Sequence, residues 1–206
     1  TLFPYTTLFR SNDFLPTGAL PVPEGDQIIP LVNQLQKKFE LIVATQDWHP
    51  KNHESFAVFH GREPGEIITL HGIEQVLWPV HCVQKSFGAQ LAVGLETNSI
   101  ERVFQKGINP EVDSYSGFFD NEHQNDTGLA SYLVEKGVSE LFIVGLALDY
   151  CVKFTALDAR QCGLNTSLIV DGTRGVNIDA SDSVKAVKEM SEAGVNIVQS
   201  LDLLTV

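Results

Sequence analysis

Residues 129–144, LASYLVEKGVSELFIV, contain a helix followed by a buried strand, and this unit decides the fold class. Leu129, Tyr132 and Leu133 have the spacing of one helix face, and Gly137 is placed to end the helix as a C-cap. The four apolar residues that close the stretch are typical of a strand covered on both faces. The unit therefore predicts a helix packed against a parallel sheet.

The same succession recurs before and after this unit. Further helices are predicted at 28–35 and 149–163, and another begins at a cap of Asp179 or Ser181 and ends at Gly194. Further strands are predicted at 41–44, 103–106, 166–170 and 195–199. Alternating helices and short apolar strands favour an α/β fold, a three-layer sandwich whose mostly parallel sheet carries helices on both faces. Residues 48–98 lack this rhythm, and long irregular segments are usually functional.

Composition and charge limit the class of protein. With 43% hydrophobic and 19% charged residues among 206, the chain is typical of one globular domain. A formal net charge of −12 and a pI near 4.8 leave no basic surface for phosphates, which argues against nucleic-acid binding. No apolar run reaches the roughly 18 residues of a membrane span, and three cysteines cannot all pair, so we expect a cytoplasmic protein without a membrane partner.

The first 11 residues, TLFPYTTLFRS, do not fit the rest of the chain. They contain no initiator Met and resemble the translation of a sequencing-library adapter, so we interpret residues 1–11 as a non-native segment. The alternative is a natural segment with strand propensity, because residues 5–9 are mostly aromatic or β-branched. Residues 12–206 are expected to form a single domain.

One carboxylate and two imidazoles form a candidate metal site. Asp47 and His49 follow an apolar run, and alternate residues of an extended segment face the same side. His81, in the segment WPVHC, is the candidate third ligand. Such a set suits zinc, iron or manganese sites that keep positions open for water or substrate. The alternative, that these are ordinary loop residues, stays open.

Cys151 is a candidate nucleophile, because it lies in the first turn of a predicted helix directly after an apolar run. A helix N-terminus favours the thiolate, and its free N–H groups can hold an oxyanion. Lys106 ends another strand-like run, and near Cys151 it would lower the thiol pKa from about 8.5. The alternatives are a small buried hydrophobe for Cys151 and a solvated surface charge for Lys106. Cys82 and Cys162 are interpreted as structural, with Cys162 buried.

Six motifs occur in order: NDF at 12–14, DWHP at 47–50, WPVHC at 78–82, FQKG at 104–107, DSYSGF at 113–118 and GLALDYC at 145–151. Each is weak alone, but together they resemble the nicotinamidase family of the isochorismatase-like (cysteine hydrolase) superfamily, over residues 12–206. The resemblance implies a six-stranded, mostly parallel sheet with flanking helices. It also implies hydrolysis of nicotinamide to nicotinate and ammonia in NAD salvage.

The resemblance assigns roles to the candidate residues. Cys151 would attack the amide carbonyl and form a thioester, while Lys106 supports the developing charge. Backbone N–H groups of Ala147 and Cys151 would form the oxyanion hole, beside a cis peptide between Ala147 and Leu148. One divalent metal, zinc first with iron or manganese as alternatives, would be held by Asp47, His49 and His81. The pyridine ring would lie in an aromatic pocket of Phe14, Trp78 and Tyr115.

One departure from the family affects the chemistry. The family pattern is Asp-x-Gln-Asn-Asp-Phe, whose leading Asp activates the cysteine, and counting back from Asn12 places Phe9 at that position and Ser11 at the Gln. A positioned base contributes about 10²–10⁴ in rate, so we predict that the chain as written is nearly inactive. The family's first strand should lie centrally in the sheet; residues 3–9 have the composition to imitate it, although Pro4 should weaken it.

Two other functions stay open on the sequence alone. A non-catalytic protein would keep the metal and pyridine site without the base, and another isochorismatase-like hydrolase would cleave a carbamoyl or ether substrate. The metal triad together with Trp78 and Tyr115 favours nicotinamide. The sequence leaves open which metal is bound and whether the chain forms a homo-oligomer.

Overall fold

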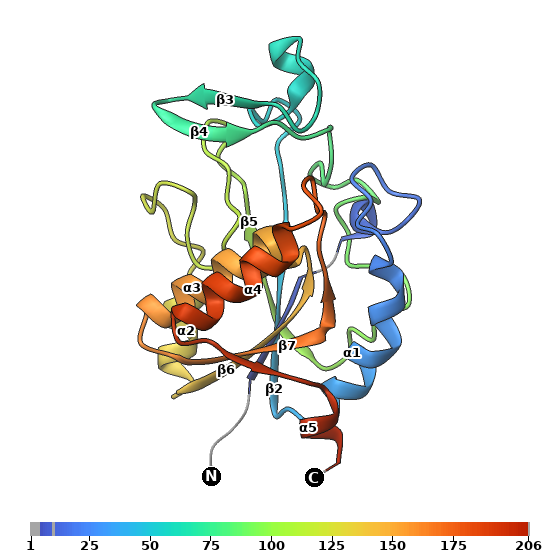
Figure 1. Cartoon of the computed structure of the whole chain (residues 1–206), viewed down its shortest axis with the longest axis vertical. Coiled ribbons are helices and arrows are strands. Elements are labelled where there is room, and N and C mark those ends of the chain that lie inside the picture. The colour runs from blue at the N-terminus through green and yellow to red at the C-terminus, as the bar shows by residue number, and fades with distance from the viewer. Residues whose placement is uncertain (1–4, 10, 206) are drawn as a thin grey trace.

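The computed structural model describes residues 5–9 and 11–205, and its centre is a six-stranded sheet in the order β5-β2-β1-β6-β7-β8 (Figure 1). Every pair of neighbours in it is parallel. The strands are β1 Tyr5–Phe9, β2 Leu41–Asp47, β5 Ile100–Lys106, β6 Glu140–Leu146, β7 Asn165–Arg174 and β8 Asn196–Val198. The predicted α/β class is confirmed.

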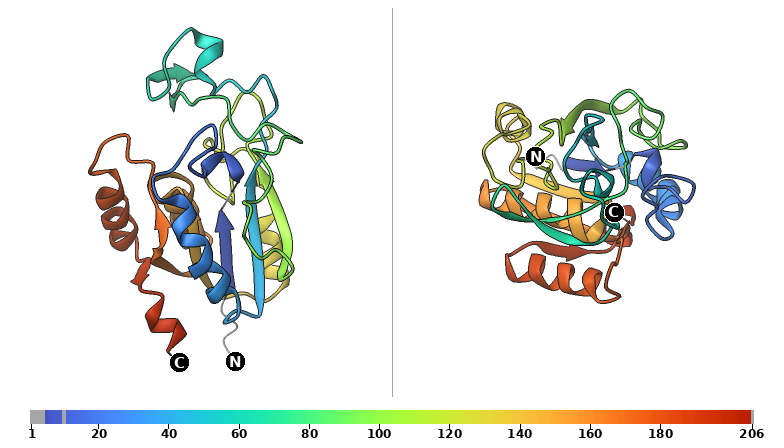
Figure 2. Two further views of the ribbon diagram at one scale, coloured as in Figure 1. Left: turned by 90° about the vertical axis from the view of Figure 1, so that its right-hand side faces the viewer. Right: turned by 90° about the horizontal axis from the view of Figure 1, so that it is seen from above.

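Helices cover both faces of this sheet (Figure 2). The α-helices are α1 Ile29–Gln36, α2 Leu129–Glu135, α3 Lys153–Gln161, α4 Asp182–Glu192 and α5 Leu201–Leu204. Leu41 and Val43 of β2 pack in one core cluster with residues of α2, α3 and α4. Ile42 and Ala44 point the other way and pack with α1 and α5. Alternation along one apolar strand therefore fills two cores, which explains the continuous apolar runs.

The central strand comes from the unusual N-terminal segment. The backbone of β1 pairs with β2 on one side and β6 on the other, and Phe9 stands opposite Thr45 and Gly145. Residues 5–9 thus occupy the place that the family's first strand was expected to take. Pro4, expected to weaken this strand, lies outside the described residues.

Several elements differ from the sequence expectation. The irregular segment contains an antiparallel hairpin, β3 Ile67–Leu70 and β4 Ile73–Val76, separate from the main sheet. Its two-residue turn has positive φ at His71 and Gly72, as a type I′ hairpin turn requires. Strand β7 runs four residues past the predicted end, because Thr173 and Arg174 pair with β6 even though their sequence is polar. The short helix α5 was not predicted.

Cys162, expected to be buried, is exposed. Helix α3 ends at Gln161, so Cys162 lies beyond the turns that pack against the sheet. The short helices are η1 Asn12–Phe14, η2 Gly25–Ile28, η3 Ala57–His60 and the π-helical η4 Leu148–Val152. Within residues 5–9 and 11–205, no helix has the length and apolarity needed to cross a membrane.

Candidate active site

The carboxyl ends of the central strands bring the candidate residues together. Asp47 is the last residue of β2 and Lys106 the last of β5, and the two stand opposite each other in the register. Cys151 lies in η4, which follows β6 after a single residue. Neighbouring parallel strands end at the same edge of a sheet, so three segments distant in sequence meet there.

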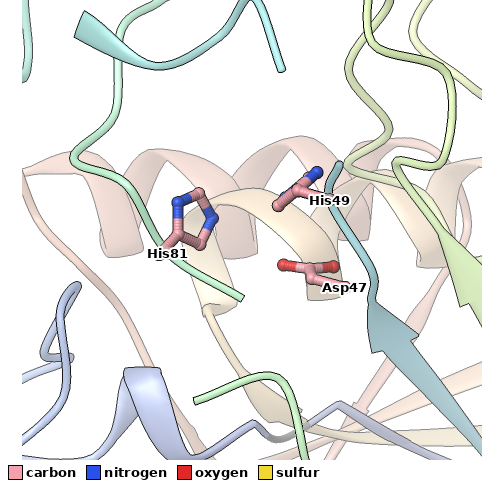
Figure 3. A group of neighbouring side chains, drawn as sticks. All are labelled: Asp47, His49 and His81. Atoms are coloured by element: carbon pink, nitrogen blue, oxygen red, sulfur yellow. The ribbon is translucent and has the colours of Figure 1, made fainter. Parts of the chain in front are cut away.

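Asp47, His49 and His81 form a buried group suited to a metal ion. Figure 3 shows their side chains around a common space, and one potential ligand atom from each lies within 4.8 Å of the others. Asp47 and His49 come from β2 and its extension, whereas His81 comes from the long irregular segment. The structure thus brings the three predicted ligands together.

Hydrogen bonds fix which nitrogen of each histidine is available. His49 Nδ1 lies 3.0 Å from the carbonyl oxygen of Gly107, and His81 Nδ1 lies 2.9 Å from that of Pro79. Because a carbonyl only accepts, Nδ1 carries a hydrogen in both rings, which leaves Nε2 as the nitrogen that can bind a metal ion. Burial, reinforced by His81, lowers the pKa of His49 to about 3. His49 is therefore neutral, as a histidine must be to bind a metal ion.

The segment that carries His81 is held by Asp13. The backbone N–H of Cys82 donates to Asp13 Oδ2 over 2.7 Å, and a Cβ on Gly88 would lie 2.1 Å from the same oxygen. Cys82 itself is buried, as expected of a structural thiol. Asp13 therefore positions His81 through the main chain without touching the metal space.

Replacing Asp13 by Ala is expected to weaken zinc binding about 10- to 100-fold, the usual effect of losing a group that orients a metal ligand. Competition against a chromophoric chelator would measure the affinity. The matched control is Asp26→Ala, because Asp26 is an exposed carboxylate in η2. Equal zinc affinity in the two variants would contradict this role for Asp13.

A second buried group shares His49 with the first and adds His53 and Asp113, again with potential ligand atoms within 4.8 Å. His53 Nε2 is buried and has no hydrogen-bond partner among the described residues. Burial would raise the pKa of Asp113, but His53, His49 and Lys106 hold it below its ordinary value. The prediction did not assign either residue to the metal site. The signal for His53 was its place four residues after His49 in a loop rich in imidazoles.

Lys106 lies between the metal group and the thiol. Its Nζ is 2.5 Å from Asp47 Oδ1, 2.5 Å from the carbonyl oxygen of Ser114 and 3.5 Å from Cys151 Sγ. Burial would lower the pKa of Lys106, but Asp47 and Cys151 raise it above its ordinary value, so the side chain is a cation. The alternative of a solvated surface lysine is wrong, because only 3% of Lys106 is exposed.

The thiol of Cys151 is not activated as the sequence suggested. Burial raises its pKa to about 12, and the lowering effect of Lys106 is smaller than this penalty and is opposed by Asp47 and Asp113. A backbone hydrogen bond from Ala147 also lowers the pKa. At neutral pH Cys151 is therefore a neutral thiol, and a reaction at this sulfur needs a base.

The turn around the thiol differs from the expectation in one detail. The cis peptide lies between Leu146 and Ala147, one bond earlier than expected, where β6 has ended and before η4 begins. Val152 N donates to the carbonyl oxygen of Ala147 over 3.0 Å, which closes the turn. Ala147, whose backbone lowers the pKa of Cys151, is one of the two residues whose N–H groups are expected to hold an oxyanion.

An aromatic pocket opens beside the thiol and the metal group. Phe14, Trp78 and Tyr115, predicted to hold a ring, all line it together with Cys151. Leu20, Tyr150 and Val176 complete its apolar wall and were not predicted. Tyr150 directly precedes Cys151, and its ring packs edge-on against Trp78 with the ring centroids 4.8 Å apart. All three predicted aromatics line a pocket, so they are more than core residues.

Fold and site together define an α/β protein in which a buried cysteine, a lysine and a triad suited to a metal ion line one aromatic pocket. The isochorismatase domain matches residues 10–202, and the chain belongs to this family. It is 51% identical to the nicotinamidase of Escherichia coli K12 over 190 residues, which cover 90% of this chain and 89% of that protein.

Solved structures extend this similarity. A nicotinamidase and pyrazinamidase of Acinetobacter baumanii superposes with a TM-score of 0.96 at 40% identity and covers 99% of both chains. The yeast nicotinamidase bound to the inhibitor nicotinaldehyde gives 0.89 at 33% identity, with 95% and 99% covered. The Pyrococcus horikoshii pyrazinamidase in complex with zinc gives 0.78 at 38% identity, with 95% and 98% covered.

Proposed function

We propose that this protein is a nicotinamidase, which hydrolyses nicotinamide to nicotinate and ammonia and serves NAD salvage. The observation that carries the proposal is the 3.5 Å contact between Lys106 Nζ and Cys151 Sγ in a pocket walled by Phe14, Trp78 and Tyr115. A flat aromatic amide fits such a wall, and its carbonyl carbon then lies within reach of the sulfur. The similarity to named nicotinamidases supports the same substrate.

The proposed reaction proceeds through a thioester. Cys151 Sγ attacks the amide carbonyl carbon while the thiol proton passes to a base, and backbone N–H groups of Ala147 and Cys151 hold the oxyanion. The C–N bond breaks, and ammonia leaves with that proton. Water then cleaves the thioester, which releases nicotinate and restores the thiol. Throughout, Lys106 offsets the negative charge near the sulfur.

The proposed metal site consists of Asp47, His49 and His81. Two imidazole Nε2 atoms and one carboxylate are a donor set that zinc, iron and manganese accept, and zinc is present in a relative. When bound, a divalent ion supplies a Lewis acid for the pyridine nitrogen and for a water molecule. His49 and His81 are kept in the right tautomer for it by Gly107 and Pro79.

We further propose that residues 1–11 are non-native and that the chain as it stands is catalytically impaired. Position 9 carries Phe where the family pattern has its base, and a thiol with a pKa of about 12 is almost fully protonated at neutral pH. The same observation favours the rival proposal, a binding protein that holds metal and pyridine without turnover. The two proposals differ in whether restoring a carboxylate restores hydrolysis.

The function is tested with a preparation in which residues 1–11 are replaced by an apolar strand ending in Asp-x-Gln. We expect stoichiometric ammonia and nicotinate from nicotinamide, and no turnover of isochorismate or N-carbamoylsarcosine. Turnover of either alternative substrate without nicotinamide hydrolysis would reassign the protein within its family. Inactivity on all three, with zinc bound and the fold intact, would support the binding protein.

A further inference from the structure

Gln75 is a buried amide on a surface hairpin. It lies on β4, and the hairpin stands beyond the carboxyl edge of the main sheet, above the site (Figure 1). Only 1% of Gln75 is exposed, whereas the neighbouring Glu74 is exposed. Burying an amide is costly unless it is hydrogen-bonded, so its partners identify what it does.

One of those partners, Tyr115, lines the aromatic pocket. Gln75 Nε2 lies 3.2 Å from the Tyr115 hydroxyl oxygen, 3.3 Å from Asp113 Oδ2 and 2.6 Å from the carbonyl oxygen of Val76. Trp78 Nε1 donates to the same Tyr115 oxygen over 3.2 Å. The Tyr115 oxygen therefore has two N–H groups within hydrogen-bonding distance, one from Gln75 and one from Trp78.

This arrangement fixes two walls of the pocket relative to each other. Trp78 and Tyr115 meet edge to face, with ring centroids 6.3 Å apart at an angle of 89°. Both rings line the pocket beside Cys151, but Gln75 does not. The Tyr115 hydroxyl joins Trp78 to the hairpin amide of Gln75, and the same amide contacts the buried Asp113 carboxylate. Losing the amide would leave the Tyr115 oxygen with Trp78 Nε1 as its remaining donor and would remove the side-chain donor at Asp113 Oδ2, both in buried positions.

We propose that Gln75 is a positioning residue that determines pyridine specificity by holding Trp78 and Tyr115 at the angle that receives the ring. It acts through Tyr115 and makes no contact with the substrate. The inference rests on the proposed function for the identity of the ligand. It adds the β3–β4 hairpin to the parts of the chain on which ring recognition depends.

The test measures nicotinamide binding to the zinc-loaded chain as it stands, which needs no catalytic base. Gln75→Met keeps the side-chain volume and removes the hydrogen bonds. We expect the Kd, followed by calorimetry, to rise about 5- to 20-fold, in line with the loss of hydrogen bonds to a neutral and a charged partner. The control is Glu74→Gln on the same strand, which should leave the Kd unchanged.

A double-mutant cycle with Tyr115→Phe separates positioning from general loss of structure. If Gln75 acts through the Tyr115 oxygen, Gln75→Met should weaken binding little further once that oxygen is gone. Additive effects, or an unchanged Kd in Gln75→Met, would overturn the inference while the function stands. No nicotinamide binding by the parent chain would overturn the ligand assignment and the inference with it. If Gln75→Met fails to fold, Tyr115→Phe alone must show the weakening.

Discussion

Replacing Phe9 by Asp in the chain as it stands is expected to raise the rate of ammonia release from nicotinamide about 10²- to 10⁴-fold, the usual contribution of a positioned base. Cys151, with a pKa of about 12, needs a group that takes its proton. Position 9 ends the central strand between Thr45 and Gly145. These two residues precede Asp47 and Ala147 by two positions each, so residue 9 ends its strand at the sequence position where the family pattern has its base.

The matched control for this prediction is Phe9→Asn, which changes size and polarity in the same way but supplies no base. Its rate should stay near that of the parent. Cys151→Ala in the Phe9→Asp background should abolish the gain, because the base then has no thiol to activate. A similar gain from Phe9→Asn would show that the unusual strand itself limits the rate of the parent chain and that the missing base does not. No gain from Asp, with zinc bound, would favour the non-catalytic protein.

Much of the fold could be predicted because the strands carry their own signal. Continuous apolar runs such as 41–44 and 141–144 are buried on both faces, and Gly137 has the φ of 71° that its predicted role as helix end requires. The β3–β4 hairpin could not be predicted in this way. Its burial pattern is weak, and its turn residues are His71 and Gly72 instead of the commoner Asn-Gly.

Site residues that end a strand could be predicted from the sequence, whereas those in the irregular segment could be predicted less well. Asp47 and Lys106 end β2 and β5, so topology alone brings them together. His53 and Gln75 lie in the irregular segment, where sequence gives position along the chain but no position in space. The thiol pKa was missed for an energetic reason. A nearby cation is visible in sequence, but the desolvation that outweighs it at Cys151 depends on packing.

The second large effect is expected from Lys106→Met, which should destabilise the zinc-free protein by about 3–5 kcal/mol. Lys106 and Asp47 form a buried ion pair at 2.5 Å, with side chains 2% and 7% exposed. Removing the cation leaves a carboxylate without a counter-charge in a place that water hardly reaches. Lys153→Met is the control, because its ion pair with Glu189 is partly exposed and should contribute no more than about 1 kcal/mol.

The partner variant tests the cause of this loss. The double variant Lys106→Met with Asp47→Asn has no unpaired buried carboxylate. Its free energy of unfolding, measured with urea on the zinc-free protein, should therefore recover most of the lost stability. Zinc should reduce the penalty of Lys106→Met alone, because a cation bound by Asp47, His49 and His81 replaces the missing positive charge. If zinc-free Lys106→Met is no less stable than Lys153→Met, then the buried pair does not stabilise the fold. In that case Lys106 is retained for its 3.5 Å contact with Cys151.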